Sequence, residues 1–82
     1  MYIPNTPQEV HDYKLGWMMR NHYSVRLHSD LDVRGKTWCR RNLERWQWKM
    51  NAWTDVYEHT FLFENKSDAD AFRSEFGRFA DQ

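Results

Sequence analysis

Two alternating stretches decide the fold of this chain: Trp46-Gln47-Trp48-Lys49-Met50-Asn51 and, five residues further on, Tyr57-Glu58-His59-Thr60-Phe61-Leu62-Phe63. In each, large apolar side chains alternate with polar ones, which is the period of a β-strand that buries one face. A short turn around Thr54-Asp55 links the two stretches. A connection this short favours an antiparallel hairpin, so we predict paired strands at residues 46–51 and 57–63.

A third alternating stretch lies upstream, at residues 22–28, and predicts another strand with Tyr23, Val25 and Leu27 on one side. Between this strand and the hairpin, an apolar stripe at helical spacing predicts a helix. Ser29, Asp30 and Asp32 offer caps for its start. The members of the stripe are Leu31, Gly35, Trp38, Cys39 and Leu43.

Each end of the chain carries a helix signal. Thr6, Pro7 and Glu9 have the spacing of a capping box and predict a helix over residues 7–19, although residues 15–19 could instead begin the first strand. At the other end, Ser67 is predicted to cap a last helix. The apolar side chains of that helix are Ala69, Phe72, Phe76 and Phe79.

These elements follow the order α-β-α-β-β-α, so we predict an α+β fold in which helices pack on one face of an antiparallel sheet. We expect one domain over residues 1–82, with residues 1–21 as a helical extension and residues 22–82 as the core. The β-α-β-β-α part matches five of the six elements of the ferredoxin-like plait. A fourth strand could come from residues assigned here to helix or from a partner chain, or it could be absent.

The two faces of the predicted sheet differ sharply in polarity, as expected for an antiparallel sheet with one solvated face. The apolar face consists of Tyr23, Val25, Leu27, Trp46, Trp48, Met50, Phe61 and Phe63. The polar face, where Leu62 is the only large apolar group, consists of Ser24, Arg26, His28, Gln47, Lys49, Asn51, Glu58, Thr60 and Glu64. RNA-recognition domains stack bases on aromatic side chains of the open face, so this arrangement argues against that function. We expect the core to contain Trp38, Trp46, Trp48, Phe61, Phe63, Phe72 and Phe76.

Several function classes are disfavoured by composition and spacing. The 12 basic and 12 acidic residues cancel, no apolar segment approaches the length that crosses a membrane, and the polar N-terminus predicts a cytoplasmic protein. The four His residues do not have metal-ligand spacing, and nothing pairs Cys39 with a catalytic base. We therefore expect no metal, no cofactor and no enzymatic activity.

The basic residues are concentrated in one part of the chain. Residues 33–54 hold six basic side chains and one acid, whereas residues 55–82 hold three basic side chains and seven acids. The middle helix could contact phosphates or an acidic partner surface, or it could be an ordinary solvated face. We predict a protein-interaction module, with nucleic-acid or nucleotide binding as the alternative. The candidate partner-binding residues are Arg26, Arg34, Lys36, Arg40, Arg41, Arg45 and Lys49.

The N-terminal helix carries more apolar surface than the sheet needs. Trp17, Met18 and Met19 either cover the protein's own core or form a self-association surface, where Trp and Met are enriched. With three strands, the sheet also leaves edges that must be covered or paired. These features predict a homodimer.

Part of the chain resembles a known group of sequences. The segments that carry the resemblance are Trp38-Cys39-Arg40-Arg41-Asn42-Leu43, Trp46 with Trp48, Thr60-Phe61-Leu62-Phe63-Glu64-Asn65, and Asp68-Ala69-Asp70-Ala71-Phe72. Together they are similar to small uncharacterised proteins of tailed bacteriophages, including marine ones, over residues 22–78. The resemblance implies a phage-encoded protein of the host cytoplasm, and by itself it implies no activity. Small phage accessory proteins commonly bind a host protein or sequester a nucleotide, and seldom act by catalysis. The resemblance carries over no functional residues.

Overall fold

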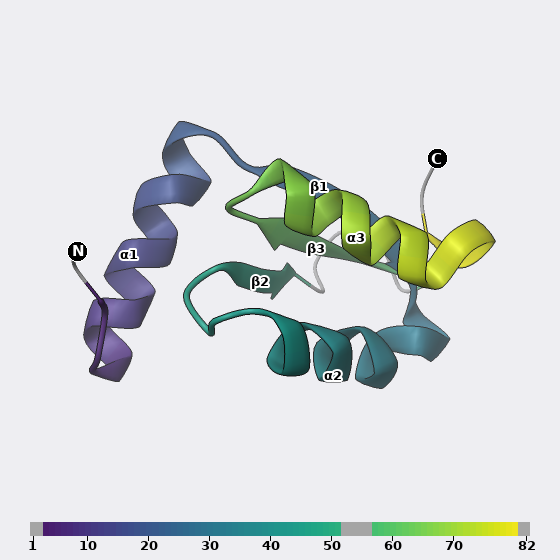
Figure 1. Ribbon diagram of the computed structural model, residues 1–82, viewed down its shortest axis with the longest axis horizontal. Helices are drawn as coiled ribbons and strands as arrows, with labels where there is room; N and C mark the ends of the chain where they lie inside the picture. The colour runs from purple at the N-terminus through teal and green to yellow at the C-terminus, as the bar shows by residue number, and fades with distance from the viewer. Residues whose placement is uncertain (1–2, 52–56, 81–82) are drawn as a thin grey trace.

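Three α-helices and three strands follow the order α-β-α-β-β-α along residues 3–51 and 57–80, the parts of the chain that the computed structural model describes (Figure 1). The turn predicted at Thr54-Asp55 lies outside them. The elements are α1 (Pro7–Arg20), β1 (Tyr23–His28), η1 (Ser29–Leu31), α2 (Asp32–Asn42), β2 (Trp48–Asn51), β3 (Glu58–Phe63), α3 (Lys66–Phe76) and η2 (Gly77–Phe79), where η marks a short 3₁₀ turn.

The strands form one antiparallel sheet in the order β1-β3-β2, so the α+β prediction is confirmed. In the register, Phe61 of β3 lies between Val25 of β1 and Met50 of β2. Because β3 is inserted between two strands that α2 connects, the order is compatible with the split β-α-β unit of a ferredoxin-like plait. Where that plait would have a fourth strand, the described residues show a single antiparallel bridge between Leu27 and Ala80.

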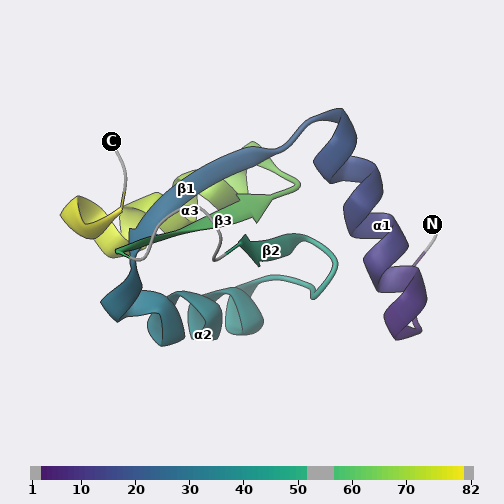
Figure 2. The same ribbon diagram turned by 180° about the vertical axis from the view of Figure 1, so that it is seen from behind.

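The core lies between one face of the sheet and the helices α2 and α3, which both views place beside it (Figures 1 and 2). Phe72 of α3 occupies its centre. The ring of Phe72 lies 4.8 Å from that of Phe61 and 5.1 Å from that of Phe63, and all three side chains are fully buried. Of the other predicted core residues, Trp38, Trp48 and Phe76 pack against this cluster but are only partly buried.

Helix α2 approaches the sheet closely at Gly35. A Cβ atom on this residue would lie 2.8 Å from both Leu27 Cδ2 and Phe61 Cζ. Real Cβ contacts are essentially never that short. The absent side chain therefore lets the α2 backbone rest directly on the core.

Helix α1 lies beside the chain that joins α2 to β2, at one end of the sheet (Figures 1 and 2). It begins with the predicted capping box, in which Thr6 and Glu9 bond each other's backbone. Trp17 is 2% exposed, and its Nε1 donates to the carbonyl oxygen of Trp46 at 2.8 Å. The Tyr13 hydroxyl donates to Glu64 at 2.7 Å.

Trp46 contradicts the prediction that it begins a strand and lies in the core. The Gln47 amide donates to the Glu44 carbonyl at 2.9 Å, and the Gln47 side chain accepts from the Glu44 amide at 2.9 Å. These two bonds close a turn, so β2 begins only at Trp48. Trp46 is partly buried outside the core cluster.

The predicted ends of two helices also need correction. Helix α2 ends at Asn42, which places Leu43 and Arg45 beyond it. Helix α3 starts from Asn65 as its N-cap rather than from Ser67. It ends where Gly77 takes a positive φ of 54°, a conformation that L side chains rarely adopt, so Phe79 falls in η2 instead of on α3.

Candidate partner-binding groove

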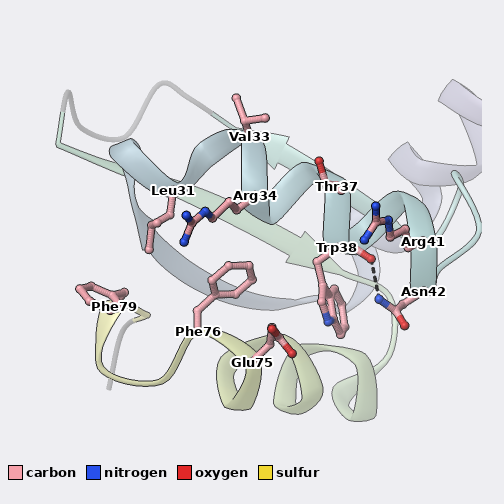
Figure 3. Close-up of a pocket in the computed structure, with 10 residues that line it drawn as sticks. All are labelled: Leu31, Val33, Arg34, Thr37, Trp38, Arg41, Asn42, Glu75, Phe76 and Phe79. Carbon is pink, nitrogen blue, oxygen red and sulfur yellow. Dashed lines mark hydrogen bonds between the residues drawn. The ribbon is translucent and has the colours of Figure 1, made fainter.

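A groove of about 750 Å³ separates α2 from the C-terminal part of α3 and η2 (Figure 3). Its lining combines apolar, basic and acidic groups. The residues are Leu31, Val33, Arg34, Thr37, Trp38, Arg41, Asn42, Glu75, Phe76 and Phe79.

The α2 side of the groove follows from helical spacing. Arg34, Trp38 and Arg41 are four and three residues apart, so they share one side of α2. At a rise of about 1.5 Å per residue, the two arginines are separated by about 10 Å along the helix, or two turns. Figure 3 shows the Trp38 ring pointing toward α3 between the two guanidinium groups. The Asn42 side-chain amide donates to the Trp38 carbonyl at 2.8 Å in the last turn of α2.

The other side of the groove comes from α3 and η2. Phe76 points up toward α2, and Glu75 lies next to Trp38 (Figure 3). The Phe76 ring is 4.8 Å from that of Phe72, and the Trp38 ring meets Phe72 edge-on at 5.5 Å. Phe72, at the centre of the core, therefore also supports the floor of the groove.

The groove exposes both charge and apolar area. Within residues 3–51 and 57–80, neither Arg34 nor Arg41 forms an ion pair, and both are exposed. Val33 is 73% exposed and Phe79 is 53% exposed. Exposed apolar patches rimmed by polar groups mark interaction sites, and aromatic residues and Arg are enriched in them.

The structure divides the predicted basic residues among separate places. Arg34 and Arg41 line the groove, whereas Lys36 Nζ lies 3.4 Å from Asp32 and Arg26 lies 3.8 Å from a carboxylate oxygen of Glu58 on the polar sheet face. The remaining members of the set are Arg40, exposed on α2, and Arg45 and Lys49, which line a second pocket beside α1. The groove therefore brings together two of the seven.

Sequence reasoning missed the apolar and acidic part of the groove. Trp38 and Phe76 were expected to be core residues, Phe79 was expected on the apolar side of the last helix, and Glu75 received no role. The spacing of Arg34, Trp38 and Arg41 was readable from the sequence, but which helix faces them was not. That contact depends on α2 and α3 lying side by side, which no local pattern encodes.

Cys39, the candidate nucleophile considered from the sequence, does not line the groove. Cys39 is fully buried, and this burial raises the pKa of its thiol to about 12, so the nucleophilic thiolate does not form near neutral pH. In the described part of the chain, no group of three or more His, Cys, Asp or Glu side chains is placed to hold a metal ion. None of the helices described is both long enough and apolar enough to span a bilayer.

The predicted self-association residues have different environments. Trp17 is buried by its own chain, which removes it from any surface available to a second copy. Met18 is partly buried, and Met19 is 83% exposed. Of the three, Met19 alone presents a largely exposed apolar side chain.

Comparison with known proteins gives no match. No family model fits this chain, and neither a curated protein nor a solved structure matches it.

Proposed function

We propose that this protein is a non-enzymatic interaction module that binds an acidic, amphipathic helical segment of a partner protein in the groove between α2 and α3. The observation that carries the proposal is the placement of two unpaired arginines, Arg34 and Arg41, on either side of the half-buried Trp38. Helix-in-groove recognition uses an apolar floor for the apolar face of the guest helix. Trp38, Phe76 and Phe79 supply that floor.

Charge and spacing define what the guest must present. The two arginines lie two helical turns apart, so they match two acids seven residues apart on one side of a guest helix. Glu75 lies on the opposite side of the groove and would repel an acid there. This charge pattern favours one orientation of the guest over the other.

The test is capture of partners from host lysate with and without nuclease, since the phage resemblance makes a bacterial host the first source to search. The bait is compared with an Arg34→Glu/Arg41→Glu variant and a control, Arg26→Glu/Arg40→Glu, which reverses as many charges outside the groove. We expect a nuclease-resistant protein that the control retains and the groove variant loses. Recovery of only nuclease-sensitive material, or equal retention by both variants, would contradict the proposal.

A second candidate function is binding of single-stranded nucleic acid in the same groove. It is favoured by the accessible part of the Trp38 ring between two arginines, because bases stack on aromatic side chains while basic groups contact phosphates. Glu75 opposes this function by repelling phosphates.

Salt dependence separates the two functions. Two phosphate contacts to a single strand predict that the logarithm of affinity falls with the logarithm of salt at a slope of about −1.4. A protein interface anchored on Trp38 and Phe76 depends mainly on apolar burial and should respond more weakly. Fluorescence anisotropy with a labelled oligonucleotide, between about 50 and 200 mM salt, measures this slope.

A further inference from the structure

A second pocket of about 320 Å³ lies between α1 and the chain that leads into β2, and it shares no lining residue with the groove. Four of its lining side chains are basic or imidazole groups: His11 and Lys14 from α1, Arg45 from the turn and Lys49 from β2. The others are Pro7, Val10, Leu15 and Met18. Among the described residues, no acid lines this pocket.

The cations are brought together by contacts that hold α1 against the turn. The Trp17 indole donates to the carbonyl of Trp46, next to Arg45 in the chain. Arg45 Nη2 donates to the Asn5 carbonyl at 2.6 Å. Lys14 Nζ lies 5.8 Å from the ring centroid of Trp48, which orients its ammonium by a cation–π contact.

The arrangement is electrostatically unfavourable without a ligand. Burial lowers the pKa of Lys14, and the positive charges of Lys49 and Arg45 lower it further. Within residues 3–51 and 57–80, none of these three side chains forms an ion pair. An anion in the pocket would relieve this repulsion.

We propose that this pocket binds a phosphate monoester that carries a small apolar group. A phosphate monoester bears a charge of about −1.5 to −2 at pH 7 and three acceptor oxygens, so it can accept from donors that approach from different elements. A single carboxylate would neutralise only one of the three cationic side chains, Lys14, Arg45 and Lys49. Val10, Leu15 and Met18 provide apolar contacts for the organic part of the ligand.

The test is a titration of the ¹⁵N-labelled protein with phenyl phosphate and with inorganic phosphate, at ionic strength held constant with sodium chloride. We expect phenyl phosphate to bind at least fivefold more tightly than inorganic phosphate. Lys49→Gln should lower the affinity for phenyl phosphate at least tenfold. Arg40→Gln, which removes one charge outside the pocket, should change this affinity less than twofold. Equal affinity for the two phosphates, or equal effects of the two variants, would overturn the proposal.

Stability measurements separate a binding role from a structural one. Without phosphate, Lys49→Gln and Lys14→Gln should melt at the same temperature as the wild type or higher, because each removes a like-charge repulsion. Phenyl phosphate should raise the melting temperature of the wild type more than that of either variant. A lowered melting temperature of both ligand-free variants would show that these lysines are structural, and would also overturn the proposal.

Discussion

At Gly35 the absence of a side chain determines how closely α2 can approach the sheet. We predict that Gly35→Ala destabilises the fold by about 1–3 kcal/mol, because the new methyl group overpacks against Leu27 and Phe61. This cost exceeds the gain of about 1 kcal/mol that alanine brings to a helix interior. Urea denaturation measures the difference in the free energy of unfolding.

Gly16 provides the matched control in α1. There the added Cβ would lie 3.3 Å from Nη1 of Arg20, at the far end of a flexible side chain that can move. Gly16→Ala should therefore stabilise the protein by up to about 1 kcal/mol. If both substitutions stabilised the fold, the close approach of α2 to the core would be contradicted.

The buried thiol of Cys39 makes the stability of the fold depend on pH in the alkaline range. Burial raises the pKa of this thiol from 9.0 to about 12, so between these values the folded chain retains a proton that the unfolded chain releases. The free energy of unfolding should therefore fall as pH rises, by about 1.4 kcal/mol per unit across that interval. Urea denaturation of the wild type and of Cys39→Ala measures this, since only the difference between them reports on the thiol. Parallel pH profiles would contradict the prediction.

At the scale of elements, α1 is attached to the rest of the molecule by a few contacts. The described core cluster contains no residue of α1, and an isolated helix of 14 residues is marginal in water. Trp17→Ala should therefore release α1 while the sheet stays folded. Hydrogen exchange should show lost protection in α1 and retained protection in β3. Tyr13→Phe, which removes only the hydroxyl bonded to Glu64, serves as a milder control. Simultaneous loss of protection in both elements would show that α1 belongs to the same cooperative unit as the sheet.

The elements also show which structural features could be predicted from sequence. The alternation of β1 and β3 gave the correct inward faces, with Val25 and Phe61 inside, because the pleat fixes a period of two. Trp46 was misassigned because backbone and side-chain bonds of Gln47 close a turn at that point. Leu62 lies on the polar face as expected, yet this residue is only 8% exposed. The alternation within β3 does not predict this burial, because it depends on residues outside the strand.

The candidate site was less predictable than the fold, for the same reason. Arg34 and Arg41 were singled out by charge alone, and nothing local distinguished them from Lys36, which pairs with Asp32. Arg34 and Arg41 line the same groove because α2 packs beside α3. Contacts between elements distant in sequence decide which charges converge, and a single sequence does not specify those contacts.

At the scale of the whole molecule, the predicted homodimer depends on the surface that α1 leaves exposed. With Trp17 buried, the large apolar side chains exposed on the described part of this helix are Leu15 and Met19, one turn apart. Light scattering over a range of concentrations should show association that Met19→Glu weakens. Arg20→Glu, which alters the charge at the neighbouring position, should weaken association less than Met19→Glu does. A protein that is monomeric at every concentration would contradict the dimer.

The position of β3 between β1 and β2 has a consequence for synthesis on the ribosome. The two outer strands do not pair with each other, so a nascent chain that ends before Glu58 carries both strands without a sheet. Translation proceeds at about 5–20 residues per second, so Val25, Leu27 and Met50 lack their β3 partners until that segment emerges. During this interval the chain exposes apolar strand faces that chaperones recognise. The sheet can therefore form, and bury these apolar faces, only after β3 has been synthesised.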